Sequence, residues 1–213
     1  MQEVAGRILA LPGTGTRCVA IDGVDGAGKT CFGDELATVL AMAGRPLIRA
    51  SVDGFHRPRA ARWARGRDSP EGFYFDSYDY QALICQLLEP LRSGGHYQVA
   101  VFDHQSDSPV AAAPQTAPPQ AILLFDGIFL QRPELRAYWD FTIFLRVDFC
   151  VSIPRCAARG DGVPDPDAPQ NRRYVEGQRL YLRSCSPEQR ADLLIDNNQL
   201  ARPLIVSEPG LGG

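Results

Sequence analysis

Residues 23–30 read Gly23-Val24-Asp25-Gly26-Ala27-Gly28-Lys29-Thr30 and match the pattern G-x-x-x-x-G-K-[ST] in full. The apolar, β-branched run 18–22 before them predicts a strand, and residues 30–43 after them carry apolar side chains at helical spacing. Glycines let consecutive backbone N–H groups turn inward around phosphate oxygens, and the helix that follows adds its positive dipole. The stretch therefore predicts a strand–loop–helix unit that binds the phosphates of a nucleoside triphosphate.

The residue types in and near this loop predict a nucleotide and metal site. We expect Lys29 to place its ammonium on the β- and γ-phosphates and the Thr30 hydroxyl to ligate Mg²⁺. Asp126 closes the apolar run 121–126 and precedes a glycine, which is typical of a carboxylate near this metal; an ordinary strand-end turn is the alternative. Thr30 and Asp126 are thus the predicted metal ligands. The predicted nucleotide-binding residues are Gly23, Asp25, Gly26, Ala27, Gly28, Lys29, Thr30 and Cys31.

Elsewhere in the chain, apolar runs alternate with helical patterns. The further strand candidates are 47–53, 98–103, 121–126, 141–147 and 192–196, and the helical patterns are 78–92, 149–159 and 171–185. Near-continuous apolar strands between helices indicate a parallel sheet that is covered on both faces. We therefore predict an α/β fold of the P-loop NTPase class, a three-layer α/β/α sandwich with a mainly parallel five-stranded sheet and a small lid.

The length of 213 residues suggests a single domain, 1–213. Compositions rich in Pro, Ala and Asp predict mobile surface at 108–120 and 160–170, and the tail from Ser207 is expected to fray. We assign a flexible insert to about 106–120 and the lid to about 149–172.

Composition excludes several classes of function. With 45% hydrophobic residues the chain can bury a core, and its net charge of -3 argues against binding nucleic acid through bulk charge. No apolar run approaches the roughly 18–20 residues of a membrane span. Six scattered cysteines without a CxxC pair, in a chain with no signal-peptide pattern, predict reduced core thiols and a cytoplasmic location. The sequence is compatible with a homo-oligomer and does not fix the oligomeric state.

Lys29 is the only lysine among the 22 basic residues. A switch GTPase reads guanine through an Asn-Lys-x-Asp motif, and a chain with no second lysine cannot contain one. Conventional guanine recognition is therefore excluded.

Asp53 follows the second strand candidate, in the segment 51–58 (SVDGFHRP). Ligands of open α/β sheets bind at the carboxyl ends of the strands, which is where this position falls. Its carboxylate is there placed to accept the proton of a hydroxyl that attacks the γ-phosphate. A helix cap or a turn is the structural alternative.

With this segment the sequence resembles the uridine kinase and phosphoribulokinase-like family of P-loop kinases, over roughly residues 17–200. The similar segments are GVDGAGKT (23–30), VDGFHRP (52–58), YFDSYDY (74–80), VFDHQSD (101–107), LLFDGIFL (123–130), FLRVDFCVSIPRCAAR (144–159) and ADLLIDN (191–197). The resemblance implies that ATP and Mg²⁺ are the cofactors and that a small-molecule hydroxyl is phosphorylated, in that family the 5′-OH of uridine or cytidine.

The resemblance also implies roles for single residues. Asp53 looks like the catalytic base, and Arg155 and Arg159 resemble lid arginines that neutralise charge on the transferred phosphoryl group. With Lys29 these form the expected catalytic set. The expected substrate-binding residues are Asp76 for ribose hydroxyls, Phe102 and His104 where the family contacts the pyrimidine, and His56.

Two further questions stay open in the sequence. The acceptor is a nucleoside or, in the same fold group, a pantothenate-, phosphoribulose- or sugar-type substrate; a non-enzymatic P-loop switch or chaperone is the alternative from another class. The arginine run 57–67, interrupted by Trp63, is either a mobile flap over the substrate site, a solvated loop or an RNA-contacting patch.

Overall fold

The computed structural model describes residues 1–111 and 113–207. Its central sheet has six strands in the order β10-β9-β8-β1-β7-β2. All neighbours pair in parallel except β10, which runs antiparallel to β9. The bounds are β1 Arg17–Gly23, β2 Leu47–Ser51, β7 Ile122–Gly127, β8 Phe141–Arg146, β9 Leu193–Asp196 and β10 Leu204–Ser207.

This sheet confirms the predicted α/β class and its mainly parallel strands, but the expected number of five strands is wrong. β10 adds a short edge strand, and because Leu204, Ile205 and Val206 are exposed it lacks the pattern of a buried strand. The prediction that residues 98–103 form a strand of the central sheet is also wrong. Within it only Phe102–Asp103 (β4) is extended, and β4 pairs with Ser108–Pro109 (β5) outside the central sheet.

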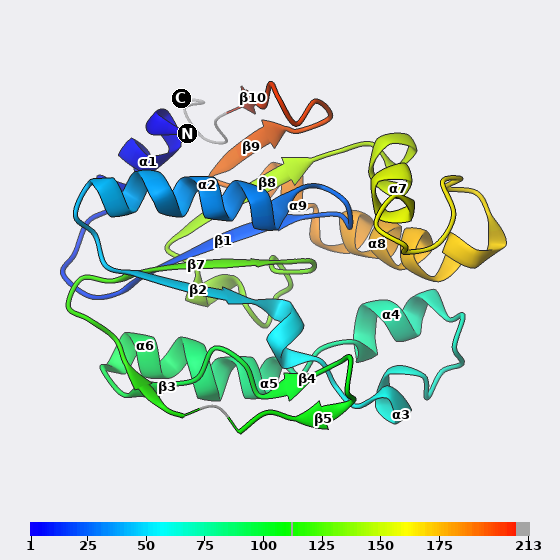
Figure 1. Ribbon diagram of the computed structural model, residues 1–213, viewed down its shortest axis with the longest axis horizontal. Coiled ribbons are helices and arrows are strands. Elements are labelled where there is room, and N and C mark those ends of the chain that lie inside the picture. Colours follow the sequence, from blue (N-terminus) through cyan, green and yellow to red (C-terminus); the bar gives the residue numbers. More distant parts are fainter. Residues whose placement is uncertain (112, 208–213) are drawn as a thin grey trace.

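Helices cover both faces of the sheet, as the predicted three-layer sandwich requires. Figure 1 shows α1 and α2 on one face, α5 and α6 on the other, and α7 and α8 beside the phosphate-loop end. The helices are α1 Gln2–Leu9, α2 Lys29–Met42, α3 Arg59–Arg62, α4 Pro70–Asp76, α5 Tyr80–Leu83, α6 Glu89–Ser93, α7 Phe149–Ala157, α8 Arg172–Cys185 and α9 Pro187–Arg190. Short helical turns lie at η1 Val52–Phe55, η2 Ile84–Leu88, η3 Arg136–Tyr138 and η4 Pro169–Asn171, and β3 His96–Tyr97 pairs with β6 Gln115–Thr116.

The helix predicted over 78–92 is divided into α5, the π-helical turn η2 and α6. Pro90 has no N–H with which to bond the carbonyl of Gln86, and its ring would crowd that carbonyl in a regular α-helix. The freed Gln86 carbonyl instead accepts the N–H of Gln98 at 2.8 Å. The widened turn thus avoids the clash between the Pro90 ring and the Gln86 carbonyl, and this carbonyl and the N–H of Gln98 are hydrogen-bonded to each other.

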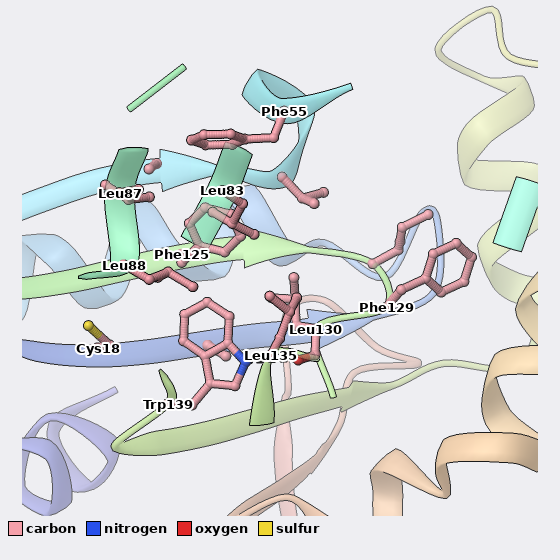
Figure 2. Packing of buried hydrophobic residues seen from close by; sticks show 14 of the residues in the cluster. Cys18, Phe55, Leu83, Leu87, Leu88, Phe125, Phe129, Leu130, Leu135 and Trp139 are labelled. Atoms are coloured by element: carbon pink, nitrogen blue, oxygen red, sulfur yellow. Dashed lines mark hydrogen bonds between the residues drawn. The ribbon is translucent and has the colours of Figure 1, made fainter. Parts of the chain in front are cut away.

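The core on the α5–α6 side anchors the two aspartates predicted for the site. Figure 2 shows Phe125 stacked on Trp139, with ring centroids 5.5 Å apart, and Phe55 in the same cluster. Phe125 directly precedes Asp126, and Phe55 lies two residues after Asp53. Both phenylalanines are fully buried, so packing fixes the backbone from which these carboxylates project.

Several expectations meet the structure only in part. Cys18, Cys156 and Cys185 are buried as predicted, whereas the three exposed thiols Cys31, Cys85 and Cys150 are not core residues. The two mobile surface segments, the lid and the insert stay predictions. The predicted fraying of the tail from Ser207 also stays a prediction, because residues 208–213 lie outside the described residues. Among the described residues, no helix has the length and apolar composition that crossing a membrane requires.

Candidate active site

The phosphate loop joins β1 to α2 and encloses a cavity of about 160 Å³. Gly26 and Gly28 have φ values of 75° and 87°, a backbone conformation that favours glycine. A Cβ on Gly26 would also lie 2.3 Å from the carbonyl oxygen of Ser152, so no other residue fits beside α7. The predicted nucleotide-binding residues that line this cavity are Asp25, Gly26, Gly28, Lys29, Thr30 and Cys31.

Gly23 and Ala27 shape the loop from behind the cavity and do not line it. A Cβ on Gly23 would lie 2.7 Å from the carbonyl oxygen of Leu145, which keeps the start of the loop close to β8. The Lys29 ammonium donates to the carbonyl of Val24 at 2.8 Å and so curls back over the loop. The backbone of the phosphate loop therefore holds the Lys29 ammonium at the cavity in which phosphates are expected to bind.

The predicted metal ligands lie together at the wall of this cavity. The Thr30 hydroxyl donates to Oδ2 of Asp126 at 3.0 Å, and both residues line the cavity. Such hard oxygen donors suit Mg²⁺, which keeps several waters and binds through one or two protein ligands plus substrate phosphates. Among the described residues no cluster of three His, Cys, Asp or Glu side chains forms a complete protein cage for a metal. The donor set thus fits a Mg²⁺ shared with phosphate oxygens.

A second cavity, of about 550 Å³, adjoins the first. Asp53 lines both cavities, together with Asp25, Tyr78, Ile128 and Arg159. It lies on η1, directly after the carboxyl end of β2, and its own side chain is exposed to the cavity space. The structure therefore places this carboxylate at the junction between a phosphate site and a larger chamber.

His56 and His104 lie in the larger cavity and stack, with ring centroids 4.6 Å apart. Nδ1 of His56 is 3.0 Å from the carbonyl oxygen of Asp53, which ties the ring to the same turn. Burial lowers the pKa of His56, because desolvation disfavours the imidazolium, and the neighbouring His104 acts in the same direction. The neutral ring is thus the favoured form within the cavity.

Two of the predicted substrate-binding residues do not line the larger cavity. Phe102 is buried on β4. Asp76 accepts from Arg65 at 2.7 Å and lies 3.6 Å from Arg57, so its carboxylate is paired with the arginine run. Ser77 and Tyr78, the next residues along the chain, reach the cavity instead.

The two predicted lid arginines lie in different surroundings. Arg159 lines both cavities, and its guanidinium donates to Sγ of Cys156 at 3.7 Å. Arg155 points elsewhere: its guanidinium donates to the backbone carbonyls of Asn198 at 2.7 Å, Asn197 at 3.2 Å and Gly26 at 3.4 Å. Arg155 thus joins the phosphate loop to the end of β9 and does not line either cavity.

Helix α8 contributes contacts that the sequence did not reveal. The side chain of Gln178 accepts the N–H of Asp25 at 2.6 Å, and the Tyr181 hydroxyl donates to Asp22 at the end of β1. Burial raises the pKa of Asp25, against the opposing influence of Lys29. No motif marks the two α8 residues, because their partners lie about 150 positions away in sequence.

Arg173, in the first turn of α8, is buried, and its guanidinium binds backbone carbonyls rather than acidic side chains. Its guanidinium donates to the carbonyls of Arg67 at 2.8 Å, Arg62 at 3.1 Å and Ser69 at 3.2 Å. It thereby fixes the arginine run against the larger cavity, which Arg62 and Trp63 also line. The position of the run agrees with a flap, while its mobility stays a prediction.

Comparison with known proteins identifies the family. The pattern of the phosphoribulokinase / uridine kinase family matches residues 18–159, and the chain belongs to this family. It is 28% identical over 138 residues to a protein named "Inorganic pyrophosphatase TTM2" from Arabidopsis thaliana, covering 64% of this chain and 19% of that protein. It is 27% identical over 133 residues to a protein named "Putative uridine kinase" from Schizosaccharomyces pombe, covering 60% and 54%. The chain thus spans about a fifth and about half of the lengths of these two relatives.

A solved structure extends the similarity to nearly the whole fold. The "Structure of a Possible Uridine Kinase from Bacillus stearothermophilus" superposes with a TM-score of 0.70 at 25% sequence identity. The match covers 90% of this chain and 95% of that one. It therefore extends beyond residues 18–159, which the family pattern matches.

Proposed function

We propose that this protein is an ATP-dependent kinase that transfers the γ-phosphate to a hydroxyl group of a small molecule, most favourably the 5′-OH of a nucleoside such as uridine or cytidine. The observation that carries the proposal is the position of Asp53. Its carboxylate lines both the phosphate-loop cavity and the adjoining chamber. A hydroxyl bound in the chamber would meet the nucleotide at this carboxylate.

In the proposed reaction the chain supplies a base, a cationic loop and a set of orienting groups. Asp53 accepts the proton of the attacking hydroxyl. Lys29 and Arg159, which line the phosphate-loop cavity, stabilise negative charge on the transferred phosphoryl group. Bound Mg²⁺, held by Thr30 and Asp126, supplies further neutralisation of phosphate charge.

The walls of the larger chamber support a nucleoside acceptor. They include Trp63, Phe73, Tyr78 and Tyr174, beside the stacked imidazoles of His56 and His104. Aromatic faces stack on planar rings, and a chamber of about 550 Å³ is in the range of small-molecule sites. Phe102 and Asp76 would need to act through neighbouring residues, since neither lines this space.

A specific observation favours a second candidate, an acceptor that carries an acidic group. Arg62 lines the chamber, and within the described residues its buried Nε atom has no hydrogen-bond partner. A buried donor without a partner is costly, and a phosphate or carboxylate would satisfy it. The phosphoribulose- and pantothenate-type acceptors have such a group, whereas a nucleoside does not.

The test is a coupled assay of ADP formation against a panel of uridine, cytidine, adenosine, pantothenate, ribulose 5-phosphate and neutral sugars. We expect strong stimulation by one class of acceptor. Slow basal hydrolysis with stimulation by none of them would contradict the kinase proposal and favour a P-loop switch or chaperone. Stimulation by the acidic acceptors alone would replace the nucleoside by the second candidate.

Asp53→Asn tests the base. We expect kcat to fall by about 10²–10⁴-fold while binding of an ATP analogue persists. Asp167→Asn, at an exposed aspartate that lines neither cavity, is the matched control. Near-wild-type turnover of Asp53→Asn would remove this residue from the proposed role.

The cellular location and the binding partners of the protein are also part of the proposal. We infer a cytoplasmic protein whose partner is its small-molecule substrate, without nucleic acid or membrane partners and with homo-oligomerisation open. The arginine run supports the absence of an RNA partner, because Arg57, Arg62 and Arg65 pair with Asp76 or Asp107.

A further inference from the structure

Arg49 lies on β2, four residues before Asp53, and reaches the carboxylate predicted to bind metal. Its Nη2 atom is 3.1 Å from Oδ1 of Asp126 and 3.0 Å from Oδ1 of Asp34. Its Nη1 atom donates to the carbonyl of Leu124 at 2.9 Å. Three acceptors on β7 and α2 thus fix the guanidinium in one orientation.

The two oxygens of Asp126 therefore have different partners. Oδ1 accepts from Arg49, and Oδ2 accepts from the Thr30 hydroxyl at 3.0 Å. The carboxylate is about nine-tenths buried, with 7% of its side chain exposed, so rotation away from these donors would leave a buried acceptor without a partner. Arg49 and Thr30 together determine which oxygen faces the phosphate-loop cavity.

An independent observation on α2 shows that the fold makes room for this guanidinium. Gly33 lies inside the helix, where glycine costs up to about 1 kcal/mol relative to alanine. A Cβ at this position would lie 2.7 Å from Nη2 of Arg49 and 2.9 Å from its Cζ. Glycine here is explained by the close approach of the arginine.

We propose that Arg49 is a positioning residue of the metal site. By holding Oδ1 of Asp126, it keeps Oδ2 beside the Thr30 hydroxyl, so that the remaining lone pairs of both oxygens are available to Mg²⁺. Residues that orient metal ligands typically affect metal affinity about 10–100-fold. The inference rests on the proposed nucleotide and metal site, and it assigns an arginine that no motif contains.

The opposite expectation follows if Arg49 acts only through its charge. A cation beside Asp126 repels Mg²⁺, so its removal would then tighten metal binding. The sign of the change therefore separates positioning from simple repulsion. The measurement is a titration of Mn²⁺, followed by the electron paramagnetic resonance of the free ion, into protein saturated with a non-hydrolysable ATP analogue.

We expect Arg49→Met to weaken Mn²⁺ binding by about 10-fold or more, while binding of the analogue without metal is unchanged. Arg49→Lys is expected to weaken it as well, because a single ammonium cannot satisfy acceptors on both β7 and α2. Equal or tighter Mn²⁺ binding by Arg49→Met would overturn the inference. Wild-type protein that binds no Mn²⁺ with the analogue would instead overturn the proposed function.

Two further variants separate positioning from loss of stability. Gly33→Ala improves helix propensity but displaces the guanidinium, so we expect weaker Mn²⁺ binding in a protein that is folded. Asp34→Asn removes the negative charge of the exposed partner of Arg49 and leaves the contact of Arg49 with Asp126, so we expect Mn²⁺ binding like that of wild type. Thermal unfolding of each variant confirms that it is folded. Wild-type Mn²⁺ affinity in Gly33→Ala, or equal weakening in Asp34→Asn and Arg49→Met, would contradict the assigned contact.

Discussion

The backbone N–H of Asp25, inside the phosphate loop, donates a hydrogen bond of 2.6 Å to the side-chain oxygen of Gln178 on α8. Gln178 is buried, and its amide nitrogen donates in turn to the carbonyl of Tyr174 at 3.0 Å. Both ends of this amide are therefore occupied, and the loop is held against a helix from the other end of the chain. The contact links the conformation of the phosphate site to the packing of α8.

Gln178→Leu should loosen the phosphate loop, because it leaves the Asp25 N–H without its acceptor. An unsatisfied donor in a largely buried position costs about 1–3 kcal/mol, so we expect lower thermal stability and an ATP-analogue affinity reduced by at most about 5–150-fold. Isothermal titration of the analogue measures the affinity. Gln189→Leu, at an exposed glutamine of α9, is the control. Unchanged analogue affinity in Gln178→Leu would mean that the loop keeps its conformation without α8.

Replacing the two lid arginines should have different consequences. Arg159→Met removes a cation that lines both cavities, and we expect kcat to fall about 10²–10³-fold with little change in stability. Arg155→Met removes hydrogen bonds to three backbone carbonyls, and we expect unfolding to become easier by about 1–3 kcal/mol. Steady-state kinetics and urea unfolding of both variants test the distinction. A larger loss of kcat in Arg155→Met than in Arg159→Met would reverse these roles.

Acceptor binding should weaken in acid through His56. Its pKa is lowered by burial, so the ring is neutral above its ordinary value of 6.5 and becomes charged only below it. Protonation would place a cation against His104 and Arg62, and Asp53 and Tyr78 also face the ring. We expect the KM for a neutral nucleoside acceptor to rise below that pH while the KM for ATP is constant.

Kinetics of His56→Gln between about pH 5 and 8 provide the check. The variant should lose the acid-side rise, and His96→Gln, at an exposed histidine on β3, should retain it. An acid-side rise that survives in His56→Gln would assign the effect to another group.

The sequence predicts those parts of the site that are local in the chain. The phosphate loop, Thr30, Asp53 and Asp126 lie at or just after the carboxyl ends of strands, and parallel strands bring these ends to one edge of the sheet. Gln178 and Arg49 could not be found in this way, because their partners are brought together only by packing. Arg155 resembles a lid arginine in sequence, but its guanidinium donates to the backbone carbonyls of Asn197 and Asn198, which lie 42 and 43 residues away in the chain.

The fold shows the same division. Buried strands such as β7 carry a continuous apolar run and are found from sequence, whereas the exposed edge strand β10 has no such signal. The sequence pattern predicts one helix over 78–92. The π-helical turn next to Pro90 also depends on Gln98, whose N–H donates to the freed carbonyl of Gln86.

Stability should depend on pH through Asp22, which is fully buried at the end of β1. Desolvation raises the pKa of its carboxyl from 3.8 to about 6, although hydrogen bonds from Tyr181 and the Gly23 N–H oppose the rise. The folded state therefore holds this proton more tightly than the unfolded chain does. The stabilising contribution is complete below about pH 4 and is lost as pH rises through about 6, which corresponds to about 3 kcal/mol.

We expect the free energy of unfolding of wild type to decrease relative to that of Asp22→Asn over this interval, in urea titrations at a series of pH values. The asparagine offers one acceptor where the carboxylate offers two, so Asp22→Asn should lose a constant increment at every pH. A constant increment cancels when the slopes are compared. Tyr181→Phe should move the wild-type decrease to higher pH, since it removes a donor that stabilises the ionised carboxylate. Parallel curves for wild type and Asp22→Asn would show that Asp22 has the same pKa in the folded and unfolded states.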